Sequence, residues 1–195
     1  MRVEENAPDE DGNVPALVDA ARRGDELAWE TLYRRLYPRL RSYLGRRVGY
    51  EHCEDAVNET MTRAVAGISR FELGEVGFDG WVFGIARRVA ADHHRSAGRS
   101  RRQGEAAQRS ADHILSGEVP EEALVISEDH AHVRQSFSKL HPNEQELLEL
   151  RVVAQLSVED VAALLGKRPG AVRTAQSRAL AHLRRLMTGE MINAT

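Results

Sequence analysis

The sequence predicts an all-α protein made of two small helical domains joined by a flexible linker. Apolar residues recur at spacings of three and four along most of the chain, which is the period of a helix with one buried face. Runs of β-branched or aromatic residues with a period of two, which indicate strands, are few. The expected units are a disordered acidic tail at 1–13, a four-helix domain at 14–97, a linker at 98–120, a helix-turn-helix domain at 121–187 and a tail at 188–195.

The first domain is expected to begin with a short helix from Val14 to Gly24, followed by a long helix. Asp25 is placed to cap the long helix, because a carboxylate accepts hydrogen bonds from the free amides of a first turn. Pro38 removes one backbone donor, so we expect a kink at that point. The apolar face of the long helix repeats every four residues and consists of Ala28, Leu32, Leu36, Leu40 and Leu44.

Gly49 is expected to end the long helix, and a third helix follows from Glu51 to Ser69. One side of this helix is apolar, while its first half is acidic. Acidic residues suit the positive end of the helix dipole, so simple capping explains them. A docking face for a basic partner explains them equally well, and both interpretations stay open at this point.

The stretch from Phe71 to Gly80 is interpreted as a loop, because it contains three glycines. Its two phenylalanines either return to the core or stack on a ligand, and the core is the better supported place for each. A fourth helix is expected from Trp81 to Ala97, and residues 86–102 hold six arginines against one acid. An aromatic loop leading into a basic helix is an arrangement that holds unpaired bases.

The second domain is expected to contain helices at 121–138, 142–154, 157–165 and 171–187. The last two form a helix-turn-helix: Ser157 is an N-cap, Asp160 stands at the capping-box position, Gly166 ends the first helix, and residues 167–170 form the turn. The last helix is apolar on one side and carries Arg, Gln and Ser on the other, which suits a DNA major groove. An ordinary helical hairpin with a solvated basic face is the alternative.

Composition restricts the possible compartments and cofactors. The net charge of −3 hides a segregated pattern, in which two mildly basic blocks flank an acidic stretch with seven acids against two arginines over residues 103–135. The single cysteine, Cys53, cannot form an internal disulfide, and its surroundings in the sequence do not resemble a metal site. No apolar run reaches membrane-spanning length and no signal peptide opens the chain, so we expect a cytoplasmic protein without cofactor or membrane contact.

Four runs in the chain resemble, in order, the extracytoplasmic-function sigma factors, which are small bacterial transcription initiation factors. The runs are EDAVNET at 54–60, WVFGIARRVAADHHR at 81–95, LHPNEQE at 140–146 and the helix-turn-helix at 156–187. The resemblance covers roughly residues 14–187. It implies a factor that binds core RNA polymerase and directs promoter recognition, promoter melting and transcription initiation, and that is not an enzyme.

The resemblance also implies a role for each region. The third helix would dock on the β′ clamp helices of polymerase through Asp55, Asn58 and Glu59. The minus-ten and melting residues would be Phe71, Phe78, Trp81, Arg87, Arg88, Asp92 and Arg95. The upstream-element residues would be Lys167, Arg168, Arg173, Thr174, Gln176, Ser177 and Arg178. Further expected partners are the polymerase β flap, promoter DNA, and an anti-sigma factor or other regulator.

The chain departs from the family pattern in both domains. The family often has Gln at the position of Asn58 and an aromatic residue near Thr60 or Met61. In the recognition helix, Ala175 and Gln176 stand where Arg and an aliphatic residue are frequent. The second departure affects the promoter sequence that would be read, and leaves the fold unaffected.

Two other functions compete with this interpretation. Asp92-His93-His94 spells the signature of a manganese-binding phosphoesterase family, but adjacent helical residues point about 100° apart and cannot all ligate one ion. The second alternative is a two-domain helix-turn-helix regulator that acts without being a polymerase subunit. The aromatic loop and basic helix argue against it, because a reader of duplex DNA needs no single-strand platform.

Overall fold

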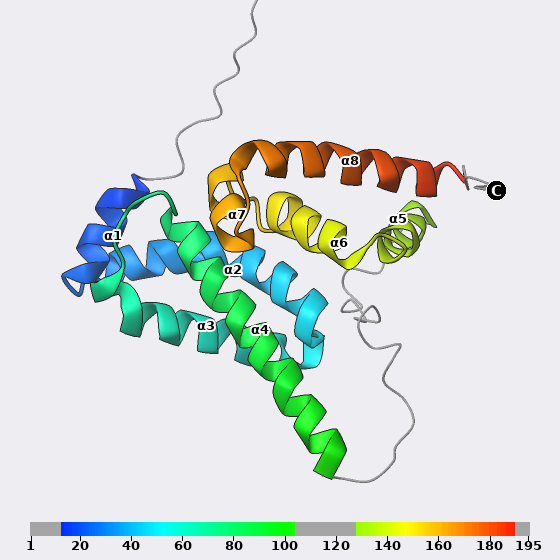
Figure 1. The fold of residues 1–195 in the computed structure, drawn as a ribbon. Coiled ribbons are helices and arrows are strands. Elements are labelled where there is room, and N and C mark those ends of the chain that lie inside the picture. Colours follow the sequence, from blue (N-terminus) through cyan, green and yellow to red (C-terminus); the bar gives the residue numbers. More distant parts are fainter. Residues whose placement is uncertain (1–12, 104–127, 190–195) are drawn as a thin grey trace, which may run out of the picture.

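The computed structural model describes residues 13–103 and 128–189, and within these ranges every regular element is helical (Figure 1). The first domain contains α1 (Val14–Arg22), α2 (Glu26–Val48), α3 (Cys53–Gly67) and α4 (Phe78–Gln103), with 3₁₀ turns at Tyr50–His52 and Ile68–Arg70. The second contains α5 (Glu128–Ser138), α6 (Pro142–Leu148), a π-helical turn at Glu149–Val153, α7 (Val158–Leu165) and α8 (Pro169–Met187). The all-α prediction is confirmed.

The predicted helix ends are largely confirmed. Asp25 accepts from the amides of Leu27 and Ala28 at 2.9 and 3.2 Å, which satisfies donors that the first turn of α2 leaves free. Gly49 follows α2 with a φ of 86°, and Gly166 follows α7 with a φ of 62°, a region in which a glycine avoids the clash that a Cβ would make.

Pro38 lies inside α2, which is continuous through it, and the kink expected there stays a prediction. Two boundaries differ from the prediction. The fourth helix begins at Phe78 instead of Trp81, because Asp79 in its first turn is held by two arginines of α2, and it continues six residues beyond Ala97 into the stretch assigned to the linker. The last helix begins at Pro169 instead of 171, since a proline needs no amide partner in a first turn.

Helix α2 is the centre of the first domain and contacts α1, α3 and α4. Leu32, Leu36, Leu40 and Leu44 on this helix are fully buried, which confirms the predicted core face. In the second domain, α8 packs across α5, α6 and α7 (Figure 1). One buried apolar cluster includes residues of both domains, so the domains pack against each other.

Some predicted segments lie outside the described residues. They are the acidic tail up to residue 12, the remainder of the linker at 104–120, the start of the second domain at 121–127 and the C-terminal end at 190–195. Within the described residues, no helix is long and apolar enough to cross a membrane.

Two substitutions of the same kind on α2 should differ strongly in their effect. Leu32→Ala removes a fully buried side chain and should lower the free energy of unfolding by about 2–5 kcal/mol. Leu27→Ala, on the same helix but 73% exposed, should change it by less than about 0.5 kcal/mol. Urea denaturation measures both, and equal losses would show that α2 does not bury the face described.

Candidate nucleic-acid interface

The acidic face of α3 is exposed. Asp55, Asn58 and Glu59 are spaced by three and four residues, so they share one side of the helix, and all three are solvent-accessible. Glu59 accepts from Arg63 Nε at 2.7 Å, and Arg63 also donates to Asp92 of α4 at 3.2 Å. The face is therefore positioned by the packing of α3 on α4, and its carboxylates are open to a partner.

The two phenylalanines of the predicted loop lie in the core. Phe71 and Phe78 are 5% and 2% exposed, and their ring centroids lie 5.7 Å apart in an edge-to-face arrangement. Trp81 packs on Phe71 at 4.9 Å and is only partly buried. Of the two places that the sequence allowed for the phenylalanines, the core is the one observed, and a direct contact with a base would require the loop to rearrange.

The cations of α4 have different surroundings. Arg88 and Arg95 are exposed, and Arg95 donates to Asp92 at 2.6 Å. Arg87 is turned toward the second domain, where its Nε donates to Glu146 at 2.8 Å and its Nη1 to the carbonyl of Leu164 at 3.2 Å. The structure thus brings one predicted phosphate-binding residue under the second domain.

The Asp92-His93-His94 run does not form a metal site. Asp92 accepts from Arg63 and Arg95, and the hydrogen bond from Arg63 lowers the pKa of Asp92. The ring of His93 packs against His52 with centroids 4.6 Å apart, and burial lowers the pKa of His93. Among the described residues, no group of three histidine, cysteine or acidic side chains is arranged to hold a metal ion.

Helix α8 and the turn before it expose most of the predicted upstream-element residues. The exposed members are Lys167, Arg168, Arg173, Thr174, Ser177 and Arg178. Arg173 pairs with Glu159 of α7 at 3.1 Å, while Gln176 is partly buried and accepts from Arg151 Nε at 2.9 Å. Arg151 also donates to the carbonyl of Leu156. Sequence reasoning missed Arg151, because nothing in its own neighbourhood signals a partner 25 residues away.

A buried carboxylate joins the two domains. Asp160 accepts from the Ser157 hydroxyl at 2.7 Å, while its Oδ1 accepts from the amide of Gly77 at 2.7 Å, in the turn before α4. Ser157 accepts from the amide of Asp160 at 2.9 Å, so the predicted N-cap is confirmed. The sequence did not predict the second contact of the Asp160 side chain, which accepts a hydrogen bond from the first domain as well as from the capping residue Ser157.

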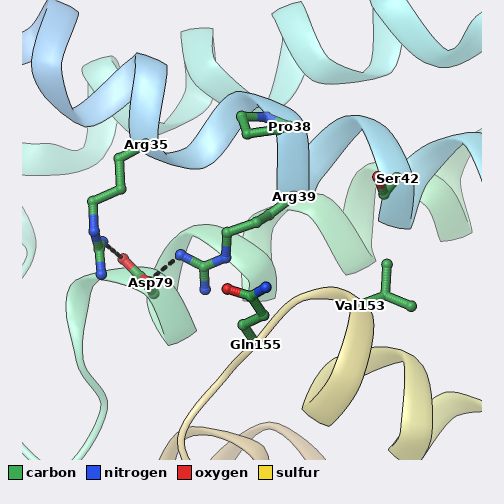
Figure 2. A pocket seen from close by; sticks show the side chains of 7 residues that line it. All are labelled: Arg35, Pro38, Arg39, Ser42, Asp79, Val153 and Gln155. Atoms are coloured by element: carbon green, nitrogen blue, oxygen red, sulfur yellow. Dashed lines mark hydrogen bonds and ion pairs between the residues drawn. The ribbon is translucent and has the colours of Figure 1, made fainter. Parts of the chain in front are cut away.

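Polar contacts continue along the domain boundary. Arg39 of α2 donates from Nη1 to Asp79 at 2.6 Å and from Nε to the carbonyl of Ala154 at 2.9 Å. Figure 2 shows Arg35 and Arg39 converging on Asp79, with Gln155 below Arg39. These residues line a cleft of about 530 Å³. This cleft separates α2 from the segment that enters α7.

A second polar contact lies at the other end of the boundary. Arg47 of α2 donates to Glu149 at 2.6 Å, and its guanidinium lies 4.6 Å from the ring centroid of Tyr43. Burial raises the pKa of Glu149 and raises that of Tyr43 to about 12. The C-terminal half of α2 therefore offers two arginines to the second domain, Arg39 to a carbonyl and Arg47 to a carboxylate.

Comparisons with known proteins agree with the two-domain division. Residues 32–100 match the model of Sigma-70 region 2, and residues 132–183 match that of Sigma-70, region 4. The chain is 34% identical to the ECF RNA polymerase sigma factor ShbA of Streptomyces griseus over 191 residues, which covers 91% of this chain and 97% of that protein. It is 30% identical to the ECF RNA polymerase sigma factor BldN of Streptomyces coelicolor, covering 93% of this chain and 68% of that one.

Solved structures share the fold. CnrH, in complex with the cytosolic domain of CnrY, superposes with a TM-score of 0.64 at 22% identity, covering 89% of this chain and 96% of that one. The sigma factor RpoE, in complex with the anti-sigma factor NepR from Bartonella quintana, superposes with a TM-score of 0.57 at 22% identity, covering 82% and 96%.

Proposed function

The chain belongs to the extracytoplasmic-function sigma factors of bacterial RNA polymerase, and from this premise we propose how its surfaces divide the work of initiation. Members of this family are transcription initiation factors. In the proposal, residues 14–97 bind core polymerase and the minus-ten DNA, residues 121–187 bind the upstream element, and residues 98–120 connect them in the cytoplasm. The observation that carries the proposal is the pairing of an exposed acidic face on α3 with an exposed cationic face on α8.

The acidic face of α3 is the proposed docking surface for the β′ clamp helices. Capping alone explains Asp55, which lies in the first turn of α3, but it does not explain Glu59, which lies beyond that turn. Glu59 is held in place by Arg63, so the face is preorganised before a partner arrives. Asn58 completes the same face, in a position where the family often has Gln.

The loop at 71–77 and the exposed side of α4 are the proposed minus-ten surface. Residues 72–75 are exposed, and the rings of Phe71 and Trp81 on either side of this segment pack on each other. Arg88 and Arg95 are exposed farther along α4 and offer cations for the phosphates of a displaced strand. Holding an extruded base costs a few kcal/mol of unstacking, so both stacking and charge are needed.

Helix α8 is the proposed reader of the upstream element. Its buried side packs on α6 and α7 through Val172 and Ala179, which leaves the opposite side for a major groove. Arg173 lies near the N-terminal end, where a recognition helix reaches deepest into the groove. A hydrogen bond from Arg151 restricts Gln176 to fewer side-chain orientations than an unpaired side chain would have.

An anti-sigma factor is the proposed regulator, together with the β flap as a second polymerase contact. One solved protein of the same fold, RpoE, is in complex with the anti-sigma factor NepR, and another, CnrH, is in complex with the cytosolic domain of CnrY. The alternative of a regulator that acts without polymerase is less well supported, because such a regulator would have no use for the Sigma-70 region 2 domain that residues 32–100 match.

Reversing the charge of the acidic face should weaken docking. Asp55→Arg with Glu59→Arg places cations where a basic partner is expected, so affinity for core polymerase should fall by about tenfold or more. The matched control is Glu26→Arg with Glu30→Arg on α2, since these acids are also four apart and Glu30 also pairs with an arginine four residues on. Titration of labelled protein with core polymerase measures both. Equal affinity for the two variants would leave capping as the explanation for the acids of α3.

The two exposed arginines of α8 should have different roles. Arg173 and Arg178 are five residues apart, hence about 140° apart around the helix, and they cannot face the same base. Arg173→Ala should relax discrimination at one base pair by about 1–3 kcal/mol, while Arg178→Ala should weaken all promoters alike through a lost phosphate contact. Holoenzyme binding to a set of single-base promoter variants distinguishes them. Uniform weakening by both substitutions would contradict this division.

A further inference from the structure

We propose that Glu159 of α7 determines the DNA specificity of the recognition helix, because its carboxylate positions Arg173 for a base edge and keeps this arginine away from the phosphates. The inference rests on the proposed function of α8 as the reader of the upstream element. It extends that function in two ways. It names the residue that makes Arg173 a base reader, and it names the base edge that Arg173 recognises, which is that of guanine.

An ion pair between α7 and α8 selects one cation out of several. Four exposed cations lie on the recognition helix or in the turn before it: Lys167, Arg168, Arg173 and Arg178. Within the part of the chain that the structure describes, Arg173 is the only one of the four with a carboxylate partner, and its Nη2 lies 3.1 Å from Glu159 Oε1. Arg173 is therefore set apart from the other three cations by its partner.

Helix capping does not account for Glu159. Ser157 already accepts a hydrogen bond from an amide in the first turn of α7, and Asp160 places a second carboxylate in the same turn. The side chains of Glu159 and Arg173 are 56% and 62% exposed, and an exposed ion pair of this kind adds little to folding stability. The pair is thus better explained by what it does to the arginine on the surface proposed for DNA.

The ion pair leaves Arg173 able to read a base. A guanidinium has five N–H donors, and the hydrogen bond to Glu159 uses one of them. A bidentate contact to O6 and N7 of guanine needs two donors, which the remaining four can supply. Guanine is the one base that presents two acceptors in the major groove, so it is the expected partner. Because Glu159 restrains the guanidinium before DNA arrives, less side-chain entropy is lost on binding.

The same carboxylate disfavours a phosphate contact at Arg173. A phosphate that approaches the arginine beside Glu159 meets a like charge, which costs free energy. The charge of Arg173 is also already compensated, so this arginine contributes less to counterion release than an unpaired one. Specificity is a difference between affinities, and it rises when the contacts that every sequence offers are weakened. Glu159 therefore lowers the affinity for all DNA and raises discrimination between sequences.

The test uses holoenzyme assembled from core polymerase and the full-length protein, either wild type or Glu159→Ala. Each holoenzyme selects from duplex promoter fragments with a randomised upstream element, and sequencing of the bound fraction gives the preferred base at each position. Affinities for the preferred fragment and its single-base variants are then measured over a range of salt concentrations. Glu159→Gln is a second variant that keeps the size of the side chain. The matched control is Glu30→Ala, which removes the acid of another exposed glutamate–arginine pair, on α2.

Wild-type holoenzyme should prefer guanine at one position, and Glu159→Ala should reduce this preference about tenfold, within the range that a bidentate base contact provides. The reduction should come chiefly from tighter binding of the mismatched fragments, and Glu159→Gln should change their affinity in the same direction. The slope of log affinity against log salt should steepen by about 0.9, which corresponds to one additional phosphate contact. In an Arg173→Ala background, Glu159→Ala should leave discrimination unchanged, because no arginine is left to redirect. Glu30→Ala should match the wild type throughout.

Two outcomes overturn the proposal. An equal loss of affinity for every fragment with Glu159→Ala and Glu159→Gln would show that Glu159 supports the fold of the domain and does not direct Arg173. Unchanged discrimination with an unchanged salt slope would show that the ion pair has no part in reading DNA. A failure of the proposed function looks different, because the wild-type holoenzyme itself would then select no sequence in the upstream element.

Discussion

The arrangement of this protein depends on one buried carboxylate, that of Asp160. A carboxylate loses its hydration on burial, and this loss is tolerated only where hydrogen bonds replace the lost water. The Gly77 amide and the Ser157 hydroxyl supply those bonds, one from each domain. The same side chain therefore caps α7 and fixes its position on α4. Because α8 packs on α7, the recognition helix is positioned by this contact as well.

The two proposed DNA surfaces are consequently linked. The exposed face of α8 is solvent-accessible while the two domains pack together, whereas the start of α4 lies under α7. The acidic face of α3, which is the proposed polymerase contact, is exposed in the same arrangement.

Local signals predicted the parts of the fold that depend on neighbouring residues. The caps at Asp25 and Gly166 and the buried face of α2 follow from residues within one or two turns, and all were found as expected. The start of α4 was placed too late because Asp79 is held by arginines 40 and 44 residues away. Asp160 was assigned to capping alone, since its second partner lies 83 residues away. Exposure of the α3 and α8 faces was predictable from amphipathicity. The hydrogen-bond partners of Arg87 and Gln176 were not, because they depend on how the helices pack against one another.

The central claim is that the Asp160 carboxylate joins the two domains. Hydrogen exchange of the Gly77 amide tests it most directly, because this amide donates to Asp160 and is protected only while that contact is made. In the free protein the amide should exchange far more slowly than that of Gly74, which lies in the exposed part of the same loop. Exchange of the Gly77 amide at the rate of the Gly74 amide in the free protein would contradict the contact between Asp160 and the turn before α4.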